Sequence, residues 1–236
     1  MLDLTLPEGA ENLALDEALL LQAEEDQSFV EVLRLWEPRR PMVVLGRSSK
    51  IAGEVHVAAC RELEIPVLRR TSGGATIITG PGCLMYTLVL SRIERPALRS
   101  ATAAHRFVLE TTAAALAPLV PGLRCRGTSD LAVGELKFSG NSIRMKRDHL
   151  LYHGTLLYDF PLELIERCLR MPPRTPDYRR RRSHGAFVTN LPLAALEIRS
   201  LLIAAWDAVE PLGRWPRERT ARLVDERYAR REWNER

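Results

Sequence analysis

A series of short extended segments separated by tight turns, from Glu135 to Leu157, constrains the fold of this chain most strongly. Lys137 stands between Leu136 and Phe138, an alternation typical of a strand that would direct one amine to one face. Segments joined by so few residues favour antiparallel neighbours over βαβ units. The sequence therefore predicts an α/β fold of the α+β type, with a mixed, largely antiparallel sheet flanked by helices.

The rest of the chain alternates strand and helix patterns. We expect strands over residues 30–36, 41–47, 67–69, 76–79, 84–90, 131–133 and 136–138. We expect helices over residues 12–26, 54–64, 97–118, 161–169, 193–209 and 216–228. Strand patterns stop near Leu191 and Pro192. The pattern therefore predicts one main domain over residues 1–190 and a short helical C-terminal extension over residues 191–236, packed on it.

Composition excludes several classes of protein. The chain has 236 residues, 46% of them hydrophobic, and no apolar run approaches the length of a membrane span. No basic segment followed by an apolar run opens the sequence, so we expect a cytoplasmic protein without a secretory signal. The four cysteines lack C-x-x-C spacing, which argues against a zinc site and a disulfide framework. The oligomeric state is left open, a monomer included.

Charge is unevenly distributed along the chain. The formal net charge is +4, but residues 1–30 contain eight acidic residues and no Lys or Arg. Residues 170–184 contain six arginines against the single acid Asp177. Such a basic segment suits a phosphate-bearing ligand or an acidic partner. Aromatic residues do not interleave the arginines, so nucleic-acid binding is not expected.

A second glycine-rich stretch lies upstream of the lysine, from Arg69 to Ala75. Exposed backbone N–H groups there can form an anion-binding nest beside arginine side chains. The stretch is neither a Walker loop nor a G-x-G-x-x-G turn into a helix, because a strand follows it. An ordinary hairpin turn is an equally good interpretation of this stretch. For Lys137 the alternative is a solvated surface charge, which is the usual role of an isolated lysine at a strand end.

Six short segments of the chain resemble segments of one known family and occur in the same order as in that family. The glycine-rich stretch Arg69–Thr76 resembles the R-R-x-S-G-G-G-x segment of the lipoate–protein ligase family, within the biotin/lipoate ligase superfamily. The other segments that resemble this family are Asn12–Ala18, Val43–Arg47, Asp130–Val133, Lys137–Asn141 and His153–Leu157. Together they cover residues 12–157, and a weaker match lies at Val188–Leu191. The resemblance implies the catalytic-domain fold of this superfamily.

The resemblance also implies a two-step reaction. Lipoate reacts with ATP in the presence of Mg²⁺ to give lipoyl-adenylate, and a lysine of an acceptor protein then takes the lipoyl group. Lys137 would be the catalytic lysine, because a fixed cation offsets the charge that builds when two anions react. The implied ATP site is Arg70, Ala75, Thr76, Ile77, Ile78 and Lys137. The implied lipoate site is Ser72, Gly73, Gly74, Lys137, Gly140, Asn141, His153 and Gly154.

Partners follow from the same resemblance. The acceptor would be a lipoyl-domain protein, such as a 2-oxoacid dehydrogenase E2 or the glycine cleavage H protein, and lipoate or octanoate would be the small-molecule substrate. The arginine run Arg179, Arg180, Arg181 and Arg182 is a candidate docking surface for this acceptor, with a solvated loop as the alternative. Asp130 is a candidate ligand of Mg²⁺, with a capping or turn aspartate as the alternative.

Two departures from the family pattern keep other functions open. Ala75 stands where the family commonly has a third glycine, and Thr79 where many members have a histidine. One alternative is an octanoyl or lipoyl transferase that holds the acyl group as a thioester on Cys125. Another is a non-catalytic subunit that only holds acyl groups or partner domains.

Overall fold

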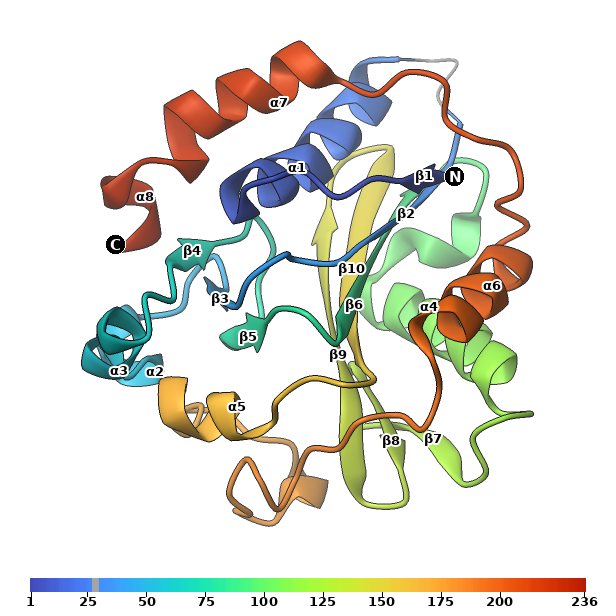
Figure 1. Cartoon of the computed structure of the whole chain (residues 1–236). Helices are drawn as coiled ribbons and strands as arrows, with labels where there is room; N and C mark the ends of the chain where they lie inside the picture. The colour runs from blue at the N-terminus through green and yellow to red at the C-terminus, as the bar shows by residue number, and fades with distance from the viewer. Residues whose placement is uncertain (27–29) are drawn as a thin grey trace.

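The computed structural model describes residues 1–26 and 30–236. Its main sheet has seven strands, which pair antiparallel except for the parallel pair at one edge (Figure 1). In spatial order they are β1 (Leu2–Asp3), β2 (Val32–Trp36), β6 (Cys83–Ser91), β10 (His149–Leu157), β9 (Leu136–Met145), β8 (Asp130–Val133) and β7 (Leu123–Arg126). The largely antiparallel sheet predicted from the short turns is confirmed.

A smaller sheet of three strands lies beside the main one. Its strands are β4 (Val67–Arg69), β3 (Met42–Leu45) and β5 (Ile77–Thr79), in that order. β3 pairs parallel with β4 and antiparallel with β5, so this sheet is mixed. The glycine-rich stretch is the connection from β4 to β5, and it therefore lies next to the main sheet where β10 and β9 pass.

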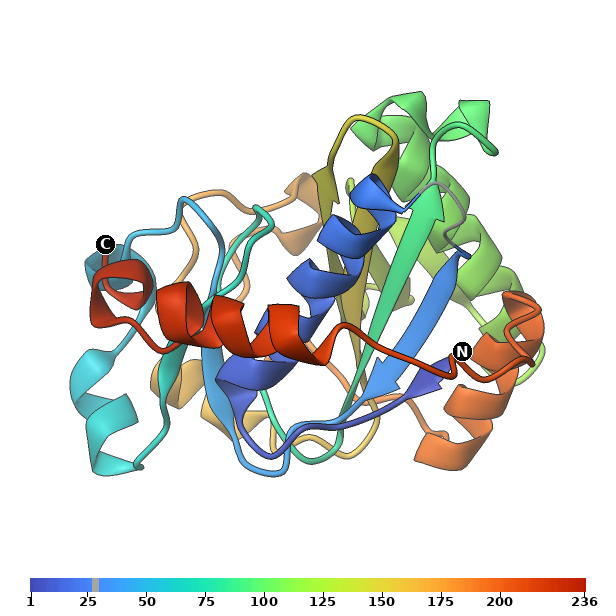
Figure 2. The same cartoon turned by 90° about the horizontal axis from the view of Figure 1, so that it is seen from above.

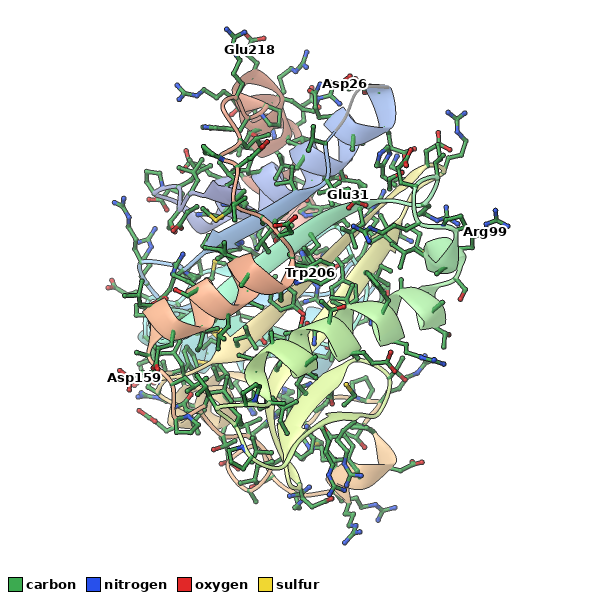
Figure 3. All side chains as sticks on the ribbon, turned by 90° about the vertical axis from the view of Figure 1, so that its right-hand side faces the viewer. Asp26, Glu31, Arg99, Asp159, Trp206 and Glu218 are labelled. Atoms are coloured by element: carbon green, nitrogen blue, oxygen red, sulfur yellow. The ribbon has the colours of Figure 1, made fainter. Side chains whose placement is uncertain are left out.

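One face of the main sheet is covered by two helices, α4 (Ala101–Leu116) and α6 (Ala195–Ala205) (Figures 1 and 3). Alternate residues of β10, such as Leu150 and Tyr152, point to this face and join one apolar core with both helices. Trp206, which follows α6, lies edge-on to the ring of Phe107 in α4, with ring centroids 5.9 Å apart. The two-residue period of the strands thus separates a helix-covered face from a face left for the site.

The opposite face carries α1 (Gly9–Glu25), the small sheet and α5 (Glu163–Cys168). The predicted helix over residues 54–64 is instead two short helices, α2 (Ile51–Glu54) and α3 (Val57–Glu62). The break occurs because Val55 pairs with Leu169 and the His56 N–H donates to the Cys168 carbonyl (2.8 Å). Tertiary pairing therefore overrides the local helical pattern.

The C-terminal residues return over the site side of the molecule. α7 (Arg217–Leu223), the π-helical turn η3 (Val224–Tyr228) and α8 (Arg231–Asn234) run past α1 toward β4 (Figure 2). Leu223 and Tyr228 belong to the same apolar core as β3 and α5. These C-terminal residues therefore pack in the same core as the small sheet and α5.

The first helix of residues 191–236 is shorter than the predicted helix over residues 193–209. Leu196 and Val209 are 75% and 68% exposed, whereas Ile198 is fully buried. The helix ends at Ala205, before Val209, and its contact face is turned accordingly. Two one-turn helices, η1 (Pro96–Arg99) and η2 (Asp177–Arg179), complete the described elements. No described helix combines the length and the apolar character needed to cross a membrane.

Candidate active site

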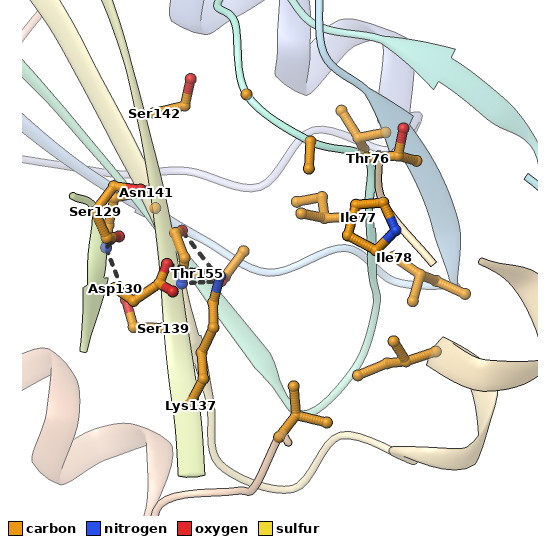
Figure 4. Close-up of a pocket in the computed structure, with 18 of the residues that line it drawn as sticks. Thr76, Ile77, Ile78, Ser129, Asp130, Lys137, Ser139, Asn141, Ser142 and Thr155 are labelled. Atoms are coloured by element: carbon orange, nitrogen blue, oxygen red, sulfur yellow. Dashed lines mark hydrogen bonds and ion pairs between the residues drawn. The ribbon is translucent and has the colours of Figure 1, made fainter. Parts of the chain in front are cut away.

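A cavity of about 470 Å³ opens between the main sheet and the small sheet (Figure 4). One wall is polar and comes from β8, β9 and the turn before β8, with Ser129, Asp130, Lys137 and Asn141. The facing wall, from β3, β5 and α5, is largely apolar: Val44, Ile77, Ile78, Ile165 and Leu169. The segment from residue 172 to residue 188 borders the same space. The cavity therefore suits a ligand with a charged end and an apolar body.

Lys137 lies at the start of β9 with its ammonium group in the cavity. Its Nζ atom is 2.7 Å from Oδ1 of Asp130, and the side chain is 28% exposed. Its backbone N–H donates to the Phe187 carbonyl (2.8 Å), and its own carbonyl accepts from the Thr189 N–H (2.9 Å). With β8 on its other side, the backbone of Lys137 is held from both edges. The amine is therefore placed by rigid backbone and not by a loop.

The glycine-rich loop is shaped from within by Arg70. This buried guanidinium donates to the carbonyls of Val44 (3.1 Å), Gly73 (2.5 Å) and Ala75 (3.0 Å), and to Oγ of Ser72 (3.1 Å). Burial lowers the pKa of Arg70 to about 10, which leaves it charged at neutral pH. Four of its five N–H donors are thus used, three inside the loop and one on β3. Arg70 lines the cavity, and its hydrogen bonds fix the conformation of the glycine-rich loop next to the cavity.

A buried chain of polar groups supports this loop from below. Oγ of Ser72 lies 2.5 Å from Nε2 of His153, and Nδ1 of His153 lies 3.4 Å from Oδ2 of Asp16. Asp16 in turn accepts from Arg34 (2.6 Å) and Thr87 (2.9 Å). Burial alone would raise the pKa of Asp16, but Arg34 and His153 outweigh it, so the pKa is lowered. The ionised carboxylate therefore fixes the ring of His153 against the loop.

Asn141 is the most firmly held polar group of the cavity wall. Its Nδ2 donates to the Ser129 carbonyl (2.9 Å) and to Oγ of Ser139 (3.1 Å), and its Oδ1 accepts from the hydroxyl of Tyr86. Gly154 leaves the space for this side chain, since a Cβ there would lie 1.8 Å from Asn141 Oδ1. Gly154 is thus required by packing within the protein.

Most of the predicted site residues meet at this cavity. Its lining includes Arg70, Gly74, Ala75, Thr76, Ile77, Ile78, Asp130, Lys137, Gly140, Asn141, His153 and Gly154. Ser72 and Gly73 are not part of the lining: Ser72 is buried behind the loop, and Gly73 accepts from Arg70. Ala75 has no positive φ angle, whereas Gly74 has a φ of 85°, so alanine fits at position 75 without strain. Thr79 is fully buried and donates to Sδ of Met85 (3.2 Å).

The expected docking run of four arginines is divided by the fold. Arg180 and Arg181 are exposed, whereas Arg179 is 4% exposed and lines the cavity. Arg182 is half-buried and donates to the carbonyls of Glu135, Tyr178 and Ala186. The expectation of one four-residue docking surface is corrected, because burial and internal hydrogen bonds withdraw Arg179 and Arg182.

Cys125 lies outside the cavity, exposed on the edge strand β7. Partial burial and the nearby Glu110 raise the pKa of its thiol, which disfavours the thiolate that a nucleophile needs.

Metal binding has one candidate side chain here. Asp130 pairs with Lys137, and its Oδ2 accepts from the hydroxyl of Tyr178 (2.8 Å). Within residues 1–26 and 30–236, no three His, Cys, Asp or Glu side chains gather into a metal-binding group. Mg²⁺ is commonly held by one or two carboxylates together with substrate phosphates. Asp130 fits that single-carboxylate role, whereas a metal cage built by the protein alone does not fit these residues.

Several supporting residues were not predicted from the sequence. Asp16 and Arg34 belong to the buried chain beneath the loop, and Glu54 accepts from the N–H (2.9 Å) and hydroxyl (2.7 Å) of Thr76. The one available signal was Arg34, a charged residue within the otherwise apolar strand V-L-R-L-W. A charge in a buried strand needs an acidic partner nearby.

Comparison with known families gives one clear match. The family model of the lipoyl protein ligase A/B catalytic domain matches residues 8–199 of this chain. Lipoate–protein ligase 1 of Staphylococcus aureus is 26% identical over 164 residues, which are 69% of this chain and 47% of that protein. The chain spans about half the length of several such curated relatives. Octanoyltransferase LipM of Carboxydothermus hydrogenoformans is 28% identical over 95% of this chain and 94% of its own length.

Solved structures share the fold over the whole chain. A lipoate–protein ligase A bound with ATP superimposes with a TM-score of 0.83 at 21% identity, covering 99% of this chain and 97% of that one. A bi-partite lipoate protein ligase from Thermoplasma acidophilum, solved in a study of that ligase and its E2 lipoyl domain, gives a TM-score of 0.84 at 22% identity, covering 99% and 94%. At these identities the likeness establishes the fold.

Proposed function

Because this chain belongs to the family of lipoyl protein ligase A/B catalytic domains, we propose that it activates lipoate with ATP and transfers the lipoyl group to a lysine of an acceptor protein. The observation that carries this proposal is the position of Lys137. Its ammonium group lies in a cavity with one polar and one apolar wall, on backbone that is hydrogen-bonded to Phe187 and Thr189 and paired with β8 on the other side.

The two walls of the cavity suit different parts of lipoate. The apolar wall, with Ile77, Ile78 and Leu169, suits the hydrocarbon chain and dithiolane ring. The carboxylate would then lie at Lys137 on the polar wall. Burial of the apolar chain contributes about 0.8 kcal/mol per CH₂. This binding energy orients the carboxylate for reaction.

The first step joins two anions. A carboxylate oxygen of lipoate attacks the α-phosphorus of ATP, a C(O)O–P bond forms, and the bond to pyrophosphate breaks. Negative charge builds at the α-phosphate during this attack. The ammonium group of Lys137 offsets that charge once the incoming anions have drawn it from Asp130, 2.7 Å away. Mg²⁺, when bound, would neutralise phosphate charge, and Asp130 would be its carboxylate ligand.

The second step needs an acceptor. The neutral ε-amine of an acceptor lysine attacks the acyl carbon of lipoyl-adenylate, an amide forms, AMP leaves, and the amine gives up a proton. The Thermoplasma system pairs its bi-partite lipoate protein ligase with an E2 lipoyl domain. We propose an acceptor of the same kind here, with octanoate as a second acyl substrate. The bi-partite character of that ligase also motivates a test for a second protein.

An octanoyltransferase is the second candidate. Its support is the octanoyltransferase relative that aligns with nearly the whole chain. The expected thioester residue, Cys125, is on an edge strand outside the cavity, with a raised thiol pKa. The hypothesis of a non-catalytic subunit rested on Ala75 and Thr79. It is no longer supported by them, because Ala75 fits the loop and Thr79 is buried away from the cavity. The geometry therefore favours the ligase.

An ATP–pyrophosphate exchange assay tests the proposal. Purified full-length chain is incubated with ATP, Mg²⁺, labelled pyrophosphate and lipoate, octanoate or no acid. We expect exchange that depends on lipoate and, to a lesser extent, on octanoate. Absence of exchange, together with octanoyl transfer from an acyl carrier thioester, would assign the chain to the transferases. Lipoate binding without exchange, also after addition of candidate second proteins, would assign it to non-catalytic subunits.

A further inference from the structure

We propose that Arg179 is a phosphate-binding residue of the active site and not part of an acceptor-docking surface. The inference rests on the proposed nucleotide chemistry of the cavity and adds a residue to it. It follows from where the fold places the first of four consecutive arginines. Charge alone does not separate Arg179 from its neighbours, whereas burial and contacts do.

The contacts of Arg179 place it in the immediate surroundings of the catalytic lysine. Its guanidinium carbon lies 4.7 Å from the centroid of the Phe187 ring. Phe187 is the residue whose carbonyl accepts the backbone N–H of Lys137 (2.8 Å). The preceding residue, Tyr178, donates its hydroxyl to Asp130, the partner of Lys137. Both Arg179 and Lys137 line the cavity.

The guanidinium of Arg179 has unused hydrogen-bonding capacity. Although the residue is 4% exposed, within the described part of the chain its only hydrogen bond as a side-chain donor runs from Nε to the Arg182 carbonyl (3.0 Å). Nη2 is buried without any hydrogen-bond partner among the described residues. No salt bridge joins Arg179 to an acidic residue in that same part of the chain. A buried, incompletely satisfied guanidinium is costly unless a ligand completes it.

The backbone around Arg179 is built to hold it inward. Arg180 and Arg181 both have left-handed conformations, with φ angles of 50° and 58°. Such angles are strained for residues other than glycine and collect at functional sites. The Arg182 N–H donates to the Arg179 carbonyl (3.0 Å) and closes the turn. The two strained residues are exposed while Arg179 remains at the cavity.

The geometry of the free guanidinium edge indicates the ligand class. Arginine forks bind planar or tetrahedral oxyanions, and phosphate is the oxyanion that a nucleotide would bring here. The carboxylate of lipoate is already matched by Lys137 on the polar wall. The phosphate is either the α-phosphate retained in the adenylate or the pyrophosphate that leaves, and the two sources can be told apart by experiment.

The test compares two Arg179 variants with one control in the full chain. Arg179→Met removes the charge and keeps most of the stem, and Arg179→Lys keeps the charge but not the fork. Arg61→Met removes one exposed arginine from α3, remote from the cavity lining. ATP, AMP, pyrophosphate and lipoate are each titrated by calorimetry, and melting temperatures are recorded.

We expect Arg179→Met to weaken ATP binding roughly 10- to 100-fold, the loss typical of one charged hydrogen-bonding group. Lipoate binding should stay unchanged, and Arg61→Met should bind both ligands like the wild type. Weaker binding of AMP as well assigns Arg179 to the α-phosphate, and weaker binding of pyrophosphate assigns it to the leaving group. Arg179→Lys should retain only part of the ATP affinity.

Equal ATP affinity in wild type and both Arg179 variants would overturn the inference, while leaving the ligase proposal in place. A parallel loss of ATP and lipoate affinity would also overturn it, because that loss indicates a structural role. If Arg179→Met fails to fold, Arg179→Lys decides by the same comparison. A wild-type chain that binds lipoate but no ATP would contradict the proposed function itself.

Discussion

Lys137 shows at the scale of a single residue how the fold creates a reactive position. The amine is ordinary in chemistry, but its backbone is fixed on both edges and its charge is paired with Asp130. A ligand that brings two anions can replace Asp130 as the partner. Pre-organised charge of this kind is effective because little reorganisation is needed when the reaction occurs.

The first prediction concerns this lysine. Lys137→Ala should lower lipoate-dependent exchange by about 10²- to 10³-fold or more, because the charge at the α-phosphate is no longer offset. The fold should survive, since the contacts that hold this position are made by the backbone. Circular dichroism and exchange kinetics check both parts, with Lys146→Ala as a matched control near the far end of β9. Near-normal exchange in Lys137→Ala would refute the assignment.

The second prediction concerns a glycine that packs against the site. Gly154→Ala would put a Cβ 1.8 Å from Asn141 Oδ1 and 2.7 Å from a ring carbon of Tyr86. Displacing these buried groups should cost about 1–3 kcal/mol of stability, as expected for overpacking. It should also raise the KM for lipoate, because Asn141 lines the cavity.

Gly53→Ala is the matched control for this change. A Cβ at Gly53 meets nothing within 4 Å, and the position is helical, so alanine should be neutral or slightly stabilising. Melting curves of the two variants measure the difference. If Gly154→Ala is as stable as Gly53→Ala, the residues around Asn141 accommodate the added methyl group without loss of stability, and the prediction is wrong.

Among single residues, the sequence pointed to cavity-lining positions where a local pattern marks them: Lys137 at a strand end and Gly74 in a glycine-rich turn. It failed for Arg179, because nothing in four identical side chains says which one turns inward. That selection is made by the left-handed turn at Arg180 and Arg181, and by the ring of Phe187. Asp16 likewise gains its role only when β10 brings His153 beside α1.

The C-terminal segment is the element that most directly couples distant sequence to the glycine-rich loop. Arg69, fully buried at the end of β4, donates to the carbonyls of Trp233 (2.9 Å), Asn234 (3.1 Å) and Arg236 (2.8 Å). Glu17 accepts from Arg227, Tyr228 (2.7 Å) and the loop residue Thr71 (3.0 Å). The segment from residue 216 to residue 236 therefore braces the start of the glycine-rich loop, directly at Arg69 and through Glu17 at Thr71.

The third prediction follows from these bonds. Deleting residues 216–236 should destabilise the whole chain by several kcal/mol, because a buried arginine and a buried glutamate each lose partners at about 1–3 kcal/mol per group. Denaturation in urea and the melting temperature measure the loss. Tyr228→Phe, which removes one bond to Glu17, should show a smaller loss in the same direction. A truncated chain with an unchanged melting temperature and full exchange would show that the segment is dispensable.

Strands were predicted better than the helical segments that pack at the ends. The antiparallel order of β8, β9 and β10 follows from short turns and two-residue alternation, which are local signals. The pairing of β10 with β6 joins strands far apart in the sequence. The break between α2 and α3 arises from a contact with Leu169, far along the chain. Trp206, Trp215 and Trp233 of the C-terminal extension contact three separate regions of the molecule.

At the scale of the whole molecule, the basic segment at residues 179–182 borders the cavity and also presents two exposed arginines to solvent. With Arg179 and Arg182 engaged internally, only Arg180 and Arg181 of the run remain exposed. We propose that these two guide an acidic acceptor domain. Such steering acts on the association rate and is screened by salt, with a Debye length of about 8 Å at physiological ionic strength.

The fourth prediction separates the two roles of the arginine run. Replacing Arg180 and Arg181 by glycine, which tolerates their left-handed angles, should slow acceptor lipoylation several-fold at low salt and leave ATP titration unchanged. The difference from wild type should shrink as salt rises. If the transfer rate changes neither with salt nor with the substitutions, Arg180 and Arg181 do not guide the acceptor and form only a solvated turn.

Formation of an acyl-adenylate in the cavity of Lys137 can be observed in a single-turnover experiment. Excess enzyme is mixed with ATP, Mg²⁺ and lipoate, quenched in acid, and analysed by mass spectrometry for small molecules and for intact protein. A parallel reaction replaces ATP and lipoate with an octanoyl carrier thioester. We expect lipoyl-AMP in the wild type, none with Lys137→Ala, and unmodified protein throughout. An acyl group found on Cys125 with no adenylate would contradict the proposed ligase chemistry.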